Sequence, residues 1–259
     1  MKKIVKMLAL GALVLSSFAG CKKTQEGKFV LGLDASFPPM GFTEADGTIV
    51  GYDIDLAKEV AKRLNLQFEA KPINWEAKEL ELSSGTIDCI WNGFTMTDER
   101  LEKMAFSKAY LNNDQVLVVR NDGKIKSLSD AKGLVIGCQA GSSAEDAIYS
   151  NKDFVDSLKS VKKYEENLTA LTDLEFGGLD AVVMDSVVAE YTIKNSKKPL
   201  TVVEESLSKE AYGIGFRNDE KGKALRDSVQ KTLEEMASDG TVAKISNAWF
   251  GKDISVIGK

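Results

Sequence analysis

One short polar segment of the chain has the residue types needed to bind a carboxylate. Residues 95–100 read TMTDER, and Thr97 followed by two acids is typical of a helix start. Arg100 would then lie in the first turn, close to the preceding strand edge. A planar guanidinium can bind a carboxylate through two parallel hydrogen bonds, the amide and hydroxyl of Thr95 can donate to the same group, and Gly93 lets the backbone approach a ligand. Taken alone, Arg100 would also fit an ordinary surface position.

A candidate partner for an ammonium group lies much later in the sequence. Asp185 follows an apolar run and supplies a carboxylate. The helix start expected at Ser142 and Ser143 offers further amide donors to an anion. A cation site and an anion site together fit a zwitterion. Asp185 could alternatively serve only as a helix cap.

The composition excludes several chemistries. The sequence contains no histidine, which removes Ser-His-Asp and Cys-His catalysis and the commonest ligand of transition metals. Apart from Cys21 only Cys89 and Cys138 exist, without the C-x-x-C spacing of a metal or redox site. We therefore expect no metal and no cofactor. The net charge of −5 argues against a nucleic-acid partner, which demands a basic face.

The first residues resemble a bacterial lipoprotein signal. Three lysines precede an apolar run over 7–15, and small residues then lead to Cys21, as in an export signal. The run is shorter than the roughly 20 apolar residues that span a bilayer. We interpret 1–20 as a signal peptide, Cys21 as the lipidated residue and 21–27 as a tether. An ordinary export signal with an incidental cysteine is the alternative. Removing 1–20, with its three lysines and no acid, would change the net charge from −5 to −8.

The rest of the chain alternates expected strands and helices, which is typical of a largely parallel sheet. We expect strands over 29–33, 66–70, 87–91, 115–120, 134–138 and 181–184. We expect helices over 52–64, 75–82, 142–150, 168–176 and about 223–238. Asp53 is the expected cap of the first helix, and Gly240 the stop of the last.

One unit of sequence occurs twice. Residues 82–89 read LSSGTIDC and residues 174–181 read LEFGGLDA, each a helix end, a glycine turn, an acid and an apolar strand. We infer two α/β lobes of similar build, with a chance match as the alternative. Because ligands bind beyond the carboxyl ends of strands in open α/β sheets, the edges at 91–95 and 183–185 would face each other across a cleft.

An ordered set of segments resembles the polar-amino-acid receptors of bacterial ABC importers, solute-binding protein family 3, which includes the glutamine-, histidine- and arginine-binding proteins. The matching segments are GYDIDLAKE at 51–59, SGTID at 84–88, GFTMTDER at 93–100, FSKAY at 106–110, and DGT through WFG at 239–251. The resemblance implies the α/β, two-lobed periplasmic-binding-protein type II (Venus-flytrap) fold. Lobe 1 would comprise 28–111 and 212–259 and lobe 2 112–211, joined by crossover strands near 110–116 and 209–212.

The resemblance also implies roles for the groups around the ligand backbone. Arg100 would bind the α-carboxylate with help from Thr95 and Ser143. Asp185 would bind the α-ammonium together with the carbonyl of Gly93.

Other residues would surround the ligand side chain. Phe37 and Trp75 would form aromatic walls, Asp34 and Gln139 would reach the side chain, and Met184 would border it. Otherwise Phe37 and Trp75 would be core residues and Asp34 a turn acid. A buried carboxylate needs a partner, so Asp34 favours arginine, lysine, histidine or glutamine over acidic ligands and leaves cystine open.

A receptor of this kind closes its lobes around the ligand, and an ABC permease with its ATPase would recognise the closed form. We expect a monomer in the cell envelope, anchored by lipid to the outer face of the cytoplasmic membrane or in the periplasm. Trp91 reads as a core residue. Cys89 and Cys138 would lie in different lobes, where a disulfide would lock the hinge, so we expect free thiols.

Two other classes of function remain open. A few members of this fold catalyse dehydration of cyclic acids, but no histidine is available here as acid or base. A sensor or adhesin would bind a ligand without feeding a transporter.

Overall fold

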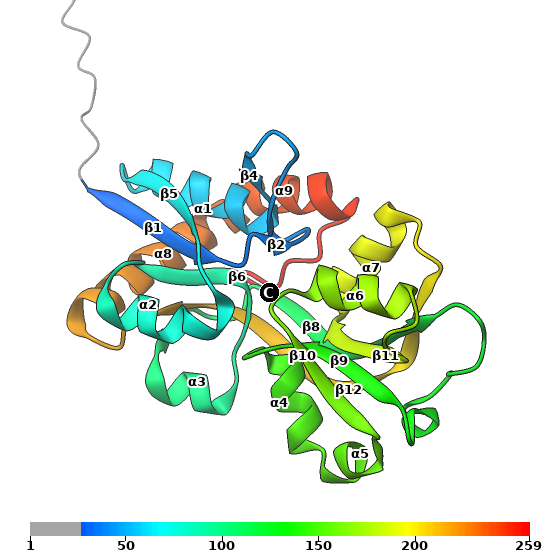
Figure 1. Ribbon diagram of the computed structural model, residues 1–259. Coiled ribbons are helices and arrows are strands. Elements are labelled where there is room, and N and C mark those ends of the chain that lie inside the picture. The colour runs from blue at the N-terminus through cyan, green and yellow to red at the C-terminus, as the bar shows by residue number, and fades with distance from the viewer. Residues whose placement is uncertain (1–26) are drawn as a thin grey trace, which may run out of the picture.

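The computed structural model describes residues 27–259 (Figure 1). The expected signal peptide, Cys21 and all of the tether except Gly27 lie outside this range. Among the helices of the described part, none is long and apolar enough to cross a membrane.

The described elements alternate between strands and helices for most of the chain. The strands are β1 (Lys28–Leu33), β2 (Ser36–Phe37), β3 (Gly41–Thr43), β4 (Ile49–Val50), β5 (Gln67–Pro72), β6 (Cys89–Thr95), β7 (Ala105–Phe106), β8 (Leu111–Arg120), β9 (Val135–Gln139), β10 (Ser160–Tyr164), β11 (Ala181–Asp185) and β12 (Leu200–Phe216). The α-helices are α1 (Tyr52–Arg63), α2 (Lys78–Ser84), α3 (Asp98–Lys103), α4 (Ser143–Ser150), α5 (Lys152–Ser157), α6 (Asn167–Glu175), α7 (Ser186–Ser196), α8 (Glu220–Ser238) and α9 (Thr241–Phe250), with 3₁₀ helices η1 (Trp75–Ala77) and η2 (Leu128–Ala131).

The main sheet has the order β10-β9-β11-β8-β12-β6-β1-β5, and β2, β3 and β4 form a separate small sheet. We call β1, β5 and β6 with α1, α2, α3, α8 and α9 lobe 1, and β9, β10 and β11 with α4 to α7 lobe 2. Within each lobe the strands pair in parallel. The antiparallel pair β8 and β12 lies between the lobes and continues into both. This is the expected α/β fold, and the lobe edges expected at 111 and 212 fall at the start of β8 and within β12.

The repeated sequence unit performs the same task in each lobe. Asp88 accepts a 2.8 Å hydrogen bond from the amide of Val30 on β1, and Asp180 accepts a 2.8 Å bond from the amide of Val135 on β9. Each acid thereby ties the turn before the third strand to the lobe's central strand. The two lobes share one local construction, which supports the repeat as structural.

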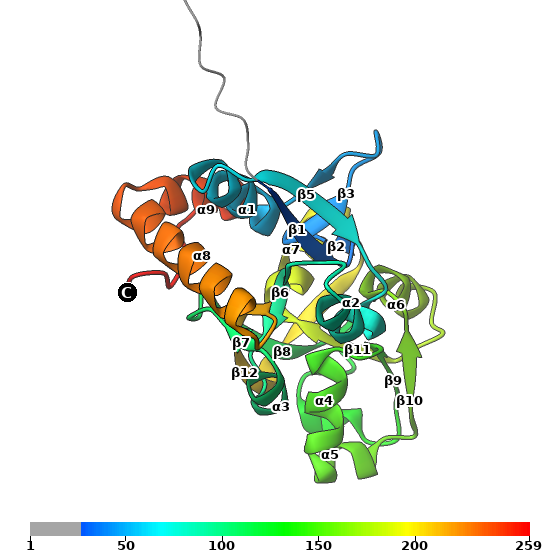
Figure 2. The ribbon, with the colours of Figure 1, turned by 90° about the vertical axis from the view of Figure 1, so that its left-hand side faces the viewer.

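Helices cover both faces of each half of the sheet. In lobe 1, α1, α8 and α9 group on one side of β1 and β6, while α2 packs on the other (Figure 2). Strand β8 is buried on both faces, and its successive side chains point alternately into two different hydrophobic cores. Val116 and Val118 join the core under α6 and α7, and Leu117 and Val119 join the core under α4 and α5. Two hydrophobic layers therefore hold the carboxyl ends of the strands in place.

The structure bears on three local expectations, for a helix cap, a helix start and two cysteines. Asp53 does not cap α1, because Gly51 takes the N-cap position with φ of 146°, where a Cβ would lie 2.2 Å from the Met40 carbonyl oxygen. Asp53 is instead fully buried inside the helix. The expected helix at 75–82 begins as the 3₁₀ turn η1 and continues as α2. Cys89 and Cys138 are buried and free, as expected.

Candidate ligand-binding site

A small cavity lies between the lobes, where the carboxyl ends of β1, β6, β9 and β11 converge. Its volume is about 10 Å³, close to the least that holds one water molecule. The lining residues are Asp34, Phe37, Trp75, Asn92, Gly93, Thr95, Arg100, Gln139, Ser142, Ser143 and Asp185. All of these are buried, so the lobes are in contact around the cavity.

Arg100 lies at one end of this cavity. Thr97 caps α3 by accepting from the Arg100 amide, which directs the guanidinium back toward β6. The Nη1 group donates to the Thr95 carbonyl at 3.0 Å, and the guanidinium carbon lies 4.6 Å from the centre of the Phe94 ring. The nearest carboxylate, that of Asp146, is 4.0 Å away and half exposed. Burial lowers the pKa of Arg100, and an anion bound here would relieve that cost.

Asp185 ends β11 and supplies a buried carboxylate from the other lobe. Its Oδ1 accepts hydrogen bonds from Asn113 at 2.7 Å, Gln115 at 3.0 Å and the Tyr212 hydroxyl at 2.8 Å. Burial, with the charge of Glu210 second, raises the pKa of Asp185 to about 7. Because these bonds all converge on Oδ1, Oδ2 remains available to a donor. A ligand ammonium would stabilise the charged form of this acid.

The far end of the cavity is closed by a contact between lobes. Gln139 Nε2 donates to Asp34 Oδ2 at 2.6 Å, while Asp34 Oδ1 accepts from both the amide and the hydroxyl of Ser36. Asn92 holds the segment by accepting from the Asp34 amide at 3.0 Å. Asp34 therefore has neutral donors on both oxygens, and no ion pair of the described residues includes it.

A second contact between lobes lies beside Arg100. The Ser143 hydroxyl donates to Thr95 Oγ1 at 3.0 Å, and the Thr95 hydroxyl donates to Glu210 on β12 at 2.8 Å. Glu210 also accepts from Gln115 on β8 at 3.0 Å. One hydrogen-bonded group thus joins lobe 1, lobe 2 and both strands of the hinge.

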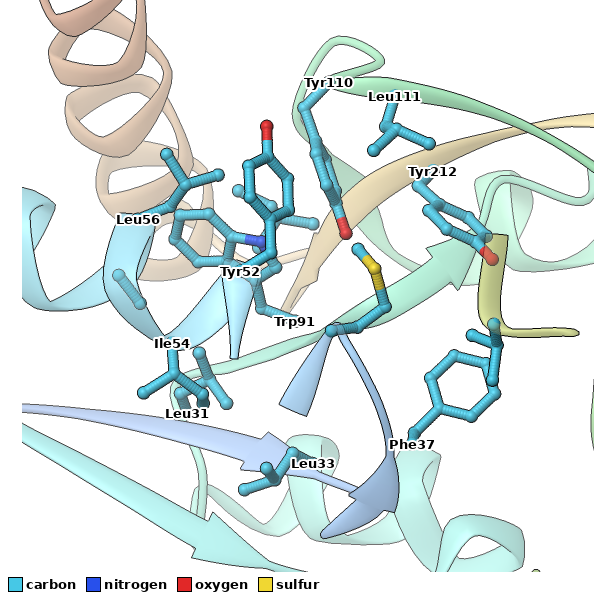
Figure 3. Packing of buried hydrophobic residues seen from close by; sticks show 14 of the residues in the cluster. Leu31, Leu33, Phe37, Tyr52, Ile54, Leu56, Trp91, Tyr110, Leu111 and Tyr212 are labelled. Atoms are coloured by element: carbon cyan, nitrogen blue, oxygen red, sulfur yellow. The ribbon is translucent and has the colours of Figure 1, made fainter. Parts of the chain in front are cut away.

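Aromatic rings line and support the cavity. Trp75 meets Phe94 edge-on at 5.8 Å between ring centres. Behind the wall, the rings of Tyr110 and Tyr212 lie 6.2 Å apart, in a row that continues toward Phe37 (Figure 3). Both tyrosine hydroxyls point in the same general direction, away from their own backbone and into the interior. The Tyr110 hydroxyl donates to Asp53 and the Tyr212 hydroxyl donates to Asp185, so both rings hold acids next to the cavity in place.

Gly93 forms part of that floor and requires its glycine. Its φ is 57°, and a Cβ there would lie 3.0 Å from the Phe37 ring and 3.1 Å from Tyr212. The buried carboxylate of Asp53 accepts from the Gly93 amide at 2.7 Å and from the Tyr110 hydroxyl at 2.8 Å. Burial raises the pKa of Asp53 to about 7. Asp53 therefore sets the direction of the Gly93 peptide rather than capping a helix.

The structure brings together nine of the ten ligand-site residues expected from the sequence. The exception is Met184, which is fully buried in the hydrophobic core and does not line the cavity, since side chains alternate along β11 and Asp185 takes the inward place. Asn92 also lines the cavity. It lies within the edge expected at 91–95 but had no expected role, although a polar residue inside an apolar strand could have indicated one. Gln115 and Glu210 gave no such signal, because hinge strands bring them to the site from distant parts of the sequence.

These features define a class of protein, a two-lobed periplasmic-binding-protein type II receptor with a polar cavity between its lobes. The sequence profile of the bacterial extracellular solute-binding proteins, family 3, matches residues 29–252, and the chain belongs to that family.

The similar proteins bind amino acids according to their names. The chain is 32% identical over 238 residues to the L-cystine-binding protein TcyJ of Escherichia coli K12, covering 90% of this chain and 86% of that protein. It matches a substrate-binding protein of an ABC uptake transporter from Streptococcus pneumoniae with bound histidine, with a TM-score of 0.84, 35% identity, and 88% and 94% of the two chains covered. It also matches AncCDT-1, an ancestral amino-acid-binding protein and precursor of cyclohexadienyl dehydratase, with a TM-score of 0.79, 32% identity, and 86% and 96% covered.

Proposed function

We propose that this protein is an extracytoplasmic lipoprotein that closes its lobes around one free polar amino acid and delivers it to an ABC permease. The observation that carries the proposal is that Arg100 and Asp185 line one cavity from opposite lobes. Each is about 95% buried, and among the described residues the one ion pair that includes either of them is the 4.0 Å contact between Arg100 and the half-exposed Asp146. A buried cation and a buried anion on facing walls fit a zwitterion, because each charge of the ligand would pair with one of the protein.

The contacts around each charge support the assignment of the ligand backbone. The carboxylate would lie against Arg100 near the amides of Thr95 and Ser143, the N-terminal residue of α4. The ammonium would lie against Asp185 and the Gly93 carbonyl. A ligand held in this way bridges the lobes and shifts the equilibrium toward the closed form.

The far end of the cavity favours a polar side chain. Asp34 is a carboxylate with only neutral donors around it, and a ligand N–H group would compete with Gln139 for it. Phe37 and Trp75 add aromatic faces that attract a cation or stack on a flat group. We therefore propose arginine, lysine, histidine, glutamine or cystine as the ligand, which agrees with the histidine and cystine named for the similar proteins.

The test is a calorimetric competition screen on the protein without its signal peptide, unfolded and refolded to remove bound ligand. The ligands are the twenty common amino acids, cystine and ornithine. We expect one of the proposed group to bind most tightly. Tightest binding of glutamate or aspartate would show that Asp34 does not face the ligand, and binding of no amino acid would overturn the proposal.

Two rival functions are separated by other measurements. A dehydratase like the descendant of AncCDT-1 would consume prephenate or arogenate, and we expect no turnover of either. A sensor or adhesin would bind the amino acid without supporting its uptake. Deletion of the gene should therefore reduce import of the labelled ligand into cells, and unchanged import would favour the sensor.

A further inference from the structure

A second buried cation lies just outside the cavity. Lys78 is the first residue of α2 and is only 4% exposed. Its Nζ donates to the carbonyl of Trp75 at 3.1 Å and to the carbonyl of Gly141 at 2.8 Å. No ion pair of the described residues includes Lys78. A buried ammonium without a counter-ion costs free energy, as does a cation at a helix N-terminus, so the fold retains it at a cost to stability.

The bond to Gly141 joins the two lobes. Trp75 and Lys78 belong to lobe 1, whereas Gly141 lies in the loop between β9 and α4 of lobe 2. Arg100 Nη2 approaches the same Gly141 carbonyl at 3.4 Å. Two cations from lobe 1 therefore converge on one carbonyl oxygen of lobe 2, and neither bond can exist when the lobes are apart.

The charges around Lys78 do not balance it. Glu76 from η1, Glu79 from α2, Asp146 from α4 and Arg100 from α3 act on its ammonium. Burial is the largest influence and the repulsion of Arg100 the second, and together they lower the pKa of Lys78 to about 8. The three carboxylates raise the pKa of Lys78, but by less than burial and Arg100 together lower it. The closed lobes thus hold two buried cations at the end of the cavity where Arg100 lies, and the printed hydrogen bonds of both side chains go to carbonyl oxygens rather than to carboxylates.

We propose that Lys78 is a positioning residue that makes closure of the lobes depend on a carboxylate bound at Arg100. In the open form its ammonium would be solvated. On closure it comes against Gly141 and close to Arg100, where the ligand's carboxylate would supply a hydrogen-bonded negative charge between two buried cations. Empty closure is thereby disfavoured relative to loaded closure. The inference rests on the proposed function and adds to it a reason why zwitterions are preferred over amino-acid amides.

The experiment compares the tightest-binding amino acid with its carboxamide, which keeps the side chain and ammonium but lacks the carboxylate charge. The measured quantity is the ratio of the two Kd values. In Lys78→Gln and Lys78→Met we expect the preference for the acid to fall about tenfold, a coupling of ordinary size between two sites. Lys78→Gln keeps a donor for Gly141, so an equal fall in both variants would assign the effect to charge. Lys78→Arg should keep the preference.

The matched control is Lys103→Met. Lys103 lies on α3, one turn from Arg100, but it is half exposed and paired with Glu99 and Glu79, so its removal should leave the ratio unchanged. A preference within twofold of the parent's in Lys78→Gln would overturn the inference while leaving the proposed function standing. If the parent binds no amino acid, the proposed function itself fails. Thermal melts of each variant confirm that the compared proteins are folded.

Discussion

Gln139 and Asp34 face each other across the two lobes, joined by a 2.6 Å hydrogen bond from the amide of one to the carboxylate of the other. They hold equivalent places, Asp34 directly after β1 and Gln139 at the end of β9, the central strands of the lobes. Gly32 and Gly137 stand two residues before them. A Cβ added at either glycine would lie 2.5 Å from an apolar side chain of the repeated unit, Ile87 in lobe 1 and Leu179 in lobe 2. The internal repeat therefore extends into the cavity, and its two copies differ there by the charge of Asp34.

That difference gives the first prediction. Asp34→Asn should weaken binding of a ligand with a cationic side chain by about thirtyfold, because a hydrogen bond to a charged group contributes about 2 kcal/mol. Binding of glutamine should change much less. Calorimetry on the refolded variant measures both. The control is Asp46→Asn, an exposed acid of the nearby β3–β4 loop. Equal losses for cationic and neutral ligands would contradict a direct contact with the side chain.

The second prediction concerns Arg100. Arg100→Ala should abolish measurable binding of every amino acid, because removing one partner of a buried charge pair costs about 3–5 kcal/mol, or roughly two to four decades in Kd. The helix cap from Thr97 uses only the backbone amide of Arg100, so the circular dichroism spectrum should not change. Arg217→Ala, which removes a guanidinium remote from the cavity, is the control. A variant that binds within threefold of the parent would refute the carboxylate role.

The third prediction tests the membrane anchor. If the sulfur of Cys21 carries the lipid, Cys21→Ser should move the protein from the membrane fraction to the soluble fraction. Cell fractionation with immunoblotting measures this, and labelling with a radioactive fatty acid should mark only the parent. Cys89→Ser and Cys138→Ser, at the two buried thiols, should leave the protein in the membrane fraction. A Cys21→Ser variant that still sediments with membranes would exclude lipidation as the anchor.

The sequence predicts many of the elements, though not α5, α7 or α9, and most of the cavity, because these depend on local patterns. The apolar runs of β1, β6, β9 and β11, the Thr97 cap and the repeated acids at Asp88 and Asp180 can each be read within a few residues. Such patterns place Arg100 and Asp185 at strand ends, where open α/β sheets bind ligands.

Long-range contacts are not visible in the sequence. Gln115 and Glu210 lie almost 100 residues apart, and only the pairing of β8 with β12 brings them to one site. Asp53 lies in the first turn of a helix that follows a glycine and reads as a cap, but its carboxylate bonds to the Gly93 amide of β6, which the helix pattern cannot reveal. Lys78 falls in a polar segment and would be read as exposed, since its burial depends on the other lobe.

The last prediction follows from the pKa of Asp185, which burial and then Glu210 raise to about 7 in the empty closed form. An ammonium bound beside this acid favours its charged form and lowers its pKa. If Asp185 keeps this raised pKa when the lobes part, the empty site holds more protons than the loaded site between about pH 5 and 7, and binding must release them. By linkage, affinity rises with pH through this range and levels off above about pH 7, with a slope of at most tenfold per pH unit. Amino-acid ammonium groups remain charged throughout, so the ligand does not add to the slope.

Titration calorimetry from pH 5.5 to 8.5, in two buffers of different ionisation enthalpy, measures both the Kd and the released protons. Glu210→Gln removes the second cause of the raised pKa, so the rise in affinity should shift to lower pH. Asp185→Asn should bind weakly and without this pH dependence. Asp53, whose pKa burial also raises to about 7, lies beneath the cavity floor, so its titration should alter stability in the empty and loaded forms alike. A Kd that stays constant from pH 5.5 to 8.5, or proton uptake on binding, would show that Asp185 does not hold the ammonium.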